Sequence, residues 1–95
     1  MNHNVKFPLG RLVATPAARR ALEEAGQPPL VFLVRHVAGD WGEVGRGDWK
    51  ANDQALRYGE RLQSAYTTAR GVKFWVVTEA DRSRTTLLLP GEHRP

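Results

Sequence analysis

Residues 61–90 read RLQSAYTTARGVKFWVVTEADRSRTTLLLP and carry the clearest structural pattern in the chain. Polar and apolar residues alternate over 62–68, and β-branched and aromatic residues fill 72–79. Both features favour half-buried β-strands. Turns at 69–71 and 80–83 separate three runs, and Pro90 ends the last one because proline has no amide donor for a strand ladder. The pattern predicts a three-stranded antiparallel meander.

The residues before this stretch predict a short strand and two or three helices. Residues 10–14 (GRLVA) suit a strand, after which Thr15 and Pro16 can start a helix that Gly26 ends. The apolar run 30–34 fits either a helix or a buried strand, but its helical stripe favours a helix. A third helix is expected from Asp48 to about residue 58, after the glycine-rich loop 39–47. The fold class is therefore α+β, with the meander packed on the helices.

Length and composition indicate one domain. The chain has 95 residues, of which 41% are hydrophobic and 25% charged, as in ordinary globular proteins. We expect a single domain over 9–90 with flexible tails at 1–8 and 91–95. Cysteine is absent, which excludes disulfides, zinc knuckles and thiol catalysis. No apolar run approaches the roughly 20 residues of a membrane span, so we expect a cytoplasmic protein without membrane contact.

The net charge of +4 is unevenly distributed. Residues 57–95 hold seven Lys/Arg against four Asp/Glu, whereas residues 1–56 hold seven against six. The positive excess therefore lies on the predicted sheet. Such a surface suits an anionic partner such as RNA, DNA or an acidic protein, although many inert domains are equally basic.

Strand pairing sorts the meander into two faces. If Thr68 pairs with Val72 and Glu79 with Arg84, one face is apolar and meets the helices, because directly opposed residues point the same way. The opposite face then carries a carboxylate among cations, the arrangement that proton transfer and phosphate binding need. We assign candidate catalytic roles to Glu79, Arg84 and Arg61. The candidate nucleic-acid-binding residues are Lys73, Trp75 as a stacking platform, Thr86 as a phosphate ligand, and Arg82. A solvated polar face with no function is the alternative reading.

Other chemistry-bearing residues have simpler interpretations. His36 and Asp40 share a helical spacing, but two ligands do not make a metal site, so a role at the helix end is favoured for His36. A general acid is the alternative for His36 if the helix end reaches the sheet edge. Ser64 lacks a nucleophile elbow and points toward the core. The loop 39–47 matches no phosphate-binding motif, and Trp41 is expected to fold back as a hydrophobic plug. No metal or cofactor is expected.

Three segments carry a resemblance to a known family: RHVAGDWG, NDQAL and KFWVVTEADRSRTTLLLP. They resemble small proteins of bacterial plasmids and integrated elements, over roughly residues 9–90. The expected element order is also similar to that of the barnase, colicin and RelE-type ribonucleases. That similarity implies metal-independent RNA cleavage on the sheet face away from the helices, although no histidine falls on this face.

Two functions therefore follow as expectations. The first is a nucleic-acid-directed protein of mobile elements with a ribonuclease-like domain. The second is a non-enzymatic module that binds a protein through the exposed face or an edge of the sheet. The sequence does not indicate an oligomeric state.

Overall fold

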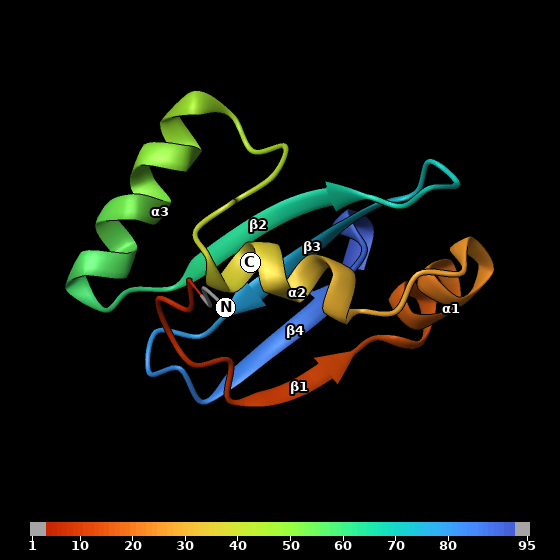
Figure 1. The fold of residues 1–95 in the computed structure, drawn as a ribbon, viewed down its shortest axis with the longest axis horizontal. Helices are drawn as coiled ribbons and strands as arrows, with labels where there is room; N and C mark the ends of the chain where they lie inside the picture. The colour runs from red at the N-terminus through yellow and green to blue at the C-terminus, as the bar shows by residue number, and fades with distance from the viewer. Residues whose placement is uncertain (1–3, 93–95) are drawn as a thin grey trace.

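The computed structural model describes residues 4–92 and confirms an α+β fold (Figure 1). The elements in chain order are β1 (Arg11–Ala14), α1 (Pro16–Ala25), α2 (Leu30–Val37), α3 (Arg46–Tyr58), β2 (Leu62–Thr67), β3 (Lys73–Thr78), β4 (Arg84–Leu88) and a 3-10 turn, η1 (Pro90–Glu92). In the part of the chain that is described, no helix is long and apolar enough to cross a membrane.

The four strands form one mixed sheet in the order β1-β4-β3-β2. The predicted meander is confirmed, since β2, β3 and β4 pair antiparallel. The turn pairings are confirmed as well: the Thr68 N–H donates to the Val72 carbonyl at 2.9 Å, and the Glu79 N–H donates to Arg84 at 3.0 Å. The predicted N-terminal strand joins the same sheet, where β1 lies parallel to β4. No local sequence pattern predicted that β4 would be the neighbour of β1.

The helices begin and end mostly where their sequence signals lie. The Thr15 hydroxyl accepts the Ala18 N–H at 3.2 Å, Pro16 occupies the first turn, and Gly26 ends α1 in a left-handed conformation. The run 30–34 is helical, as the stripe predicted. The predicted start of α3 at Asp48 is wrong, because α3 begins at Arg46 after Gly45. Asp48 lies in the first turn, where its negative charge interacts favourably with the positive end of the helix dipole.

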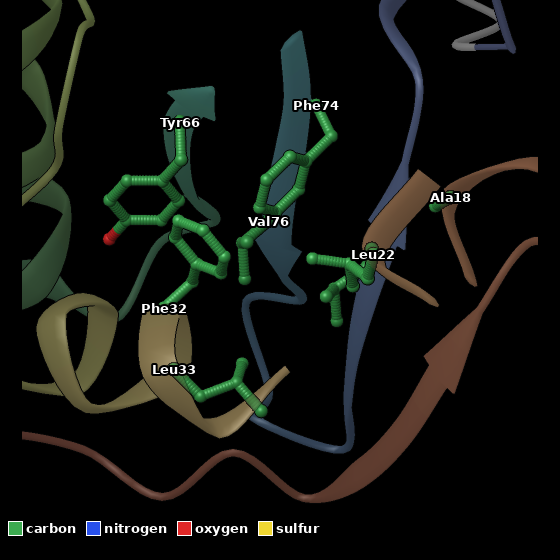
Figure 2. Close-up of a cluster of buried hydrophobic side chains, with 8 residues drawn as sticks. Ala18, Leu22, Phe32, Leu33, Tyr66, Phe74 and Val76 are labelled. Carbon is green, nitrogen blue, oxygen red and sulfur yellow. The ribbon is translucent and has the colours of Figure 1, made fainter. Parts of the chain in front are cut away.

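The main core lies between the sheet and helices α1 and α2. Figure 2 shows Phe32 and Leu33 of α2 reaching toward the sheet, where they meet aromatic and aliphatic side chains of β2 and β3. The Phe32 and Phe74 rings meet edge to face with centroids 4.8 Å apart, a favourable geometry for aromatic pairs. The cluster consists of Ala18, Leu22, Phe32, Leu33, Tyr66, Phe74, Val76 and Leu87.

A second cluster holds α3 to the end of β2. It is built from Phe7, Trp41, Ala55 and Leu62. Trp41 is fully buried, which confirms the expected plug. Phe7 lies within the expected N-terminal tail but is only 5% exposed, and the Lys6 N–H donates to Val37 at 2.8 Å. This end of the tail is therefore packed on the domain, while residues 1–3 and 93–95 lie outside the described residues.

Candidate nucleic-acid interface

The sheet has one apolar face and one mixed face, as the sequence predicted. The strand register puts Tyr66 beside Phe74 and Val76 beside Leu87, and these side chains are buried against α1 and α2. Alternate residues point the other way. Trp75 lies between Ala65 and Leu88 on this second face, which we call the open face. Both buried clusters draw their strand residues from the first face, where α1 and α2 pack. On the open face, Ala65 and Val77 are also buried, so its exposed part lies toward the ends of the strands.

Four charged residues form a line across one end of the open face. Arg11 of β1 is the register partner of Arg84 of β4. Glu79 is next to Arg84, because its N–H donates to the Arg84 carbonyl. The pairing of Leu62 with Thr78, continued by one residue, puts Arg61 on the other side of Glu79. We call Arg11, Arg84, Glu79 and Arg61 the arginine row; it lies at the end of the sheet where β1 begins (Figure 1).

The arginine row is exposed. All three arginines are exposed and Glu79 is half-buried. Neighbouring strands lie about 4.8 Å apart, so the row spans about 14 Å. Within residues 4–92, no ion pair joins Glu79 to any of these arginines, whereas Arg35 and Asp40 form one elsewhere at 2.8 Å. The row therefore presents three guanidinium groups and one carboxylate to solvent at one height of the sheet, an arrangement that suits anions.

The structure brings together the three predicted catalytic residues but spreads the predicted binding residues along the sheet. Thr86 follows two residues after Arg84 and pairs with Val77 on the open face. Trp75 is half-buried and four residues from Glu79, or about 13 Å along the strand. Lys73 is exposed at the opposite end of β3, about 20 Å from the row. Thr86 and Trp75 thus connect the row to Lys73 across one face.

Arg82 is placed differently from the other candidates. Its guanidinium donates to the carbonyls of Glu60, Glu79 and Ala80 at 2.6, 3.1 and 3.2 Å. It also lies 5.6 Å from the centre of the Phe7 ring, which belongs to the second buried cluster. Arg82 therefore fastens the end of α3 to the turn between β3 and β4, on the helix side of the sheet.

His36 is buried and structural, not a cap at the helix end as the sequence favoured. Its Nδ1 lies 2.6 Å from the Ser64 hydroxyl, and its Nε2 lies 2.9 Å from the Thr78 hydroxyl. Thr78 contacts Thr85 at 2.7 Å, and Thr85 donates to the Leu9 carbonyl at 2.7 Å.

The direction of this chain of hydrogen bonds fixes the state of His36. A carbonyl only accepts, so Thr85 donates to Leu9 and accepts from Thr78. Thr78 has no second proton and accepts from Nε2–H, which leaves Nδ1 to accept from Ser64. The neutral imidazole thus satisfies every partner. Burial, with a smaller effect of the Arg82 charge, lowers the pKa of His36 to about 4.

The loop 39–47 closes the outer edge of β2. Asp40 accepts a hydrogen bond from Arg35 at 2.8 Å and one from the Gly42 N–H at 3.1 Å. The Arg35 bond is the main reason that the pKa of Asp40 lies below its usual value. Gly42 (φ 75°) bridges to Ala65, and a Cβ at Gly42 would overlap the Ala65 carbonyl. In residues 4–92, no three His, Asp or Glu side chains gather where a metal ion could bind.

Arg11 is the member of the row that sequence reasoning missed. It was assigned to a strand, but its position beside Arg84 depends on the parallel pairing of β1 with β4. A sequence-level signal existed, since a right-handed crossover connection through helices typically returns a strand parallel to the first. That signal did not specify which strand would be the neighbour.

Comparisons of the chain with protein-family models, with curated proteins and with solved structures found no match. The resemblance to small plasmid-borne proteins and the similarity in element order to RelE-type ribonucleases therefore stay predictions.

Proposed function

We propose that the open face binds RNA through its phosphates and that Glu79 accepts a proton in metal-independent cleavage of the bound strand. The observation that carries this proposal is the arginine row, in which one carboxylate lies between cations on the two neighbouring strands. The three arginines are exposed and lie at one end of the sheet, which leaves the row accessible to a long polymer. The excess positive charge of residues 57–95 acts in the same direction.

The spacing of the row suits a polyanion. Arg84 and Arg61 lie two strands apart, about 10 Å, on either side of Glu79. A phosphate directly above Glu79 would be repelled, so successive phosphates are held by the two arginines while the sugar between them lies over the carboxylate. Guanidinium groups match phosphate oxygens with paired donors. Thr86 and Trp75, both half-buried, lie further along the same face.

The chemistry follows from this placement. Glu79 takes the proton of a ribose 2′-hydroxyl, the 2′ oxygen forms a bond to the adjacent phosphorus, and the bond from phosphorus to the 5′ oxygen breaks. The leaving oxygen takes a proton from water, and the first product ends in a 2′,3′-cyclic phosphate. The arginine that holds this phosphate stabilises the negative charge that develops on the phosphorane, and the other arginine holds the neighbouring phosphate in place. This electrostatic effect is the larger contribution, and proton transfer supplies roughly 10²–10⁴-fold.

A protein-interaction module is the second candidate. It is supported by exposed apolar side chains beside β1, where Leu12 is 53% exposed and Leu30 of α2 is 65% exposed. Contiguous apolar surface of this kind often marks a contact with another protein. This surface lies on the other side of the sheet from the arginine row, so the two functions are compatible.

The test uses a labelled single-stranded RNA in the presence of EDTA. We expect the wild-type chain to cleave it and Glu79→Gln to bind it more tightly without cleaving it, because the variant keeps the arginines and removes a negative charge. Arg84→Gln should weaken binding and slow cleavage. Lys50→Gln, an equal charge change at an exposed position of α3, serves as the matched control.

The possible outcomes test RNA binding and catalysis by Glu79 separately. Cleavage that persists in Glu79→Gln, or that requires a divalent metal, contradicts the catalytic role. Binding without cleavage in the wild type supports RNA recognition and removes the reaction. An absence of both binding and cleavage contradicts the whole proposal.

A further inference from the structure

The two edges of the sheet are finished in different ways. Along β2, the Ala65 N–H donates to Trp41 at 3.0 Å and the Ala65 carbonyl accepts from Glu43 at 2.7 Å. The side-chain amide of Asn52 occupies both backbone groups of Gln63. Gln63 and Ala65 are the residues of β2 whose backbone N–H and C=O groups face away from β3. All four groups therefore have hydrogen-bond partners within the chain. This edge cannot take another strand without losing these bonds.

The β1 edge has no such cover. Arg11 and Thr15 donate their N–H groups to Ser83 and Leu87 of the β4 side, each at 3.0 Å. Because strand residues alternate, the peptide groups of Leu12 and Ala14 face away from the sheet. Across residues 4–92, no hydrogen bond from another segment reaches them. In Figure 1, β1 forms the rim of the molecule, with no other described element beyond it.

The surface beside this edge is apolar. A groove of about 390 Å³ runs between β1, α2 and the arm that precedes β1. Leu12, Leu30 and Val34 line it and are 53%, 65% and 53% exposed. None of the ten residues that line the groove is charged. Open backbone groups beside apolar side chains are the features of an edge that pairs with another strand.

We propose that β1 pairs antiparallel with β1 of a second copy of this chain, which joins two four-stranded sheets into one of eight strands. The outward groups fix the register. Leu12 of each copy lies opposite Ala14 of the other, Val13 lies on the two-fold axis, and four backbone hydrogen bonds form. If the two β1 strands shifted to the next hydrogen-bonded register in either direction, Gly10 or Pro16 would have to form the next backbone hydrogen bonds. Gly10 has a φ of 66°, and proline has no N–H.

Charge complementarity favours a second copy as the occupant. In this register, Arg11 lies opposite Thr15 of the second copy and on the same face. The Thr15 hydroxyl is 2.7 Å from Glu92 Oε1 within its own chain. Arg11 therefore approaches the Glu92 carboxylate of the second copy, and symmetry makes this contact twice. The two arginines stay four positions apart and do not repel each other at close range.

Dimer formation would affect the arginine row, although the dimer does not require the row to bind RNA. A two-fold axis perpendicular to the sheet keeps both open faces on one side of the assembly. In the dimer, the charge of Arg11 is partly neutralised by Glu92 of the second copy. Arg84 and Arg61 then remain the principal cations available to an RNA strand.

The experiment measures the mass of the full chain by light scattering during size-exclusion chromatography, over a range of concentrations. We expect a mass of two chains at tens of micromolar. Leu12→Pro should shift the mass to one chain and raise the dimer Kd at least tenfold, because it removes a donor that only the second copy uses. Proline is tolerated at such an outward edge position, so its circular dichroism and thermal midpoint should match those of the wild type.

Two further variants keep the test decisive. Arg11→Glu leaves all backbone groups in place and should raise the dimer Kd at least tenfold through repulsion from Glu92. Tyr58→Ser, which removes a 70% exposed aromatic side chain elsewhere, should leave the Kd unchanged. A wild-type chain of monomer mass at millimolar concentration overturns the proposal, and so does a dimer whose Kd responds to neither Leu12→Pro nor Arg11→Glu. RNA binding is measured separately and does not decide this result.

Discussion

The side chain of Asn52 binds both backbone groups of Gln63: its Nδ2–H donates to the Gln63 carbonyl at 2.7 Å, and its Oδ1 accepts the Gln63 N–H at 3.0 Å. The amide thus takes the place of a neighbouring strand. Asn52 is 7% exposed, so both groups of Gln63 are shielded from much of the solvent. This side chain anchors α3 to the edge of β2, in addition to the second buried cluster.

Replacement of Asn52 by leucine should lower the free energy of unfolding by about 2 kcal/mol, because two partly buried backbone groups lose their partners. Urea denaturation measures this change. Gln54→Leu is the matched control, since Gln54 is exposed on the same helix, and it should change stability by less than about 0.5 kcal/mol. Equal effects of the two variants would contradict the role of Asn52.

Acid should destabilise the fold through His36. Its pKa is lowered from 6.5 to about 4 in the folded state, so the unfolded state binds more protons between these values. Stability is therefore full above pH 6.5 and declines as the pH falls toward 4. The linkage predicts a loss of about 2 kcal/mol between pH 7 and pH 5. His36→Gln, which does not titrate, should show a flatter profile in urea unfolding, and an unchanged slope in that variant would refute the assignment.

Gly42 and Gly59 have similar φ angles but should respond differently to replacement by alanine. Gly42 has a φ of 75° and a Cβ there would overlap the Ala65 carbonyl, whereas Gly59 has a φ of 71° and no atom within 4 Å of a new Cβ. Gly59→Ala should cost about 1–2 kcal/mol, the strain of the left-handed conformation. Gly42→Ala should cost at least about 2 kcal/mol more, since it also displaces the segment that covers β2. Thermal unfolding of both variants compares the two costs.

Arg82 and Arg84 are two positions apart, but their replacement should have different effects: one should lower stability and the other should weaken RNA binding. Arg82→Ala removes hydrogen bonds to the Glu60 and Glu79 carbonyls and should lower the free energy of unfolding by about 2 kcal/mol. Arg84→Ala should change it by no more than about 0.5 kcal/mol while it weakens RNA binding. The reverse pattern in unfolding and filter-binding measurements would contradict both placements.

Much of the fold follows from local sequence signals. The alternation in residues 62–68 and the two short turns specify the meander, and Thr15, Pro16 and Gly26 mark the ends of α1. These signals act between near neighbours. The parallel pairing of β1 with β4 joins segments about 70 residues apart, and no local pattern encodes it.

The candidate site divides in the same way. Glu79, Arg84 and Arg61 could be assigned to one face because hairpin register follows from turn length. Arg11 could not, since its place depends on the long-range pairing. The hydrogen bonds from Arg82 to four carbonyls also escaped prediction, because a cation in a turn looks the same in the sequence whether it faces solvent or backbone groups. His36 was misjudged because its partners, Ser64 and Thr78, lie on strands far along the chain.

The most direct test of RNA recognition by the arginine row is the salt dependence of affinity for a single-stranded RNA. Each phosphate neutralised on a single strand contributes about −0.7 to the slope of log K against log salt concentration. The account predicts that Arg84→Gln and Arg61→Gln each make the slope shallower by about 0.7, while Lys50→Gln leaves it unchanged. A slope that is the same in all four proteins, or no measurable binding by the wild type, would contradict it.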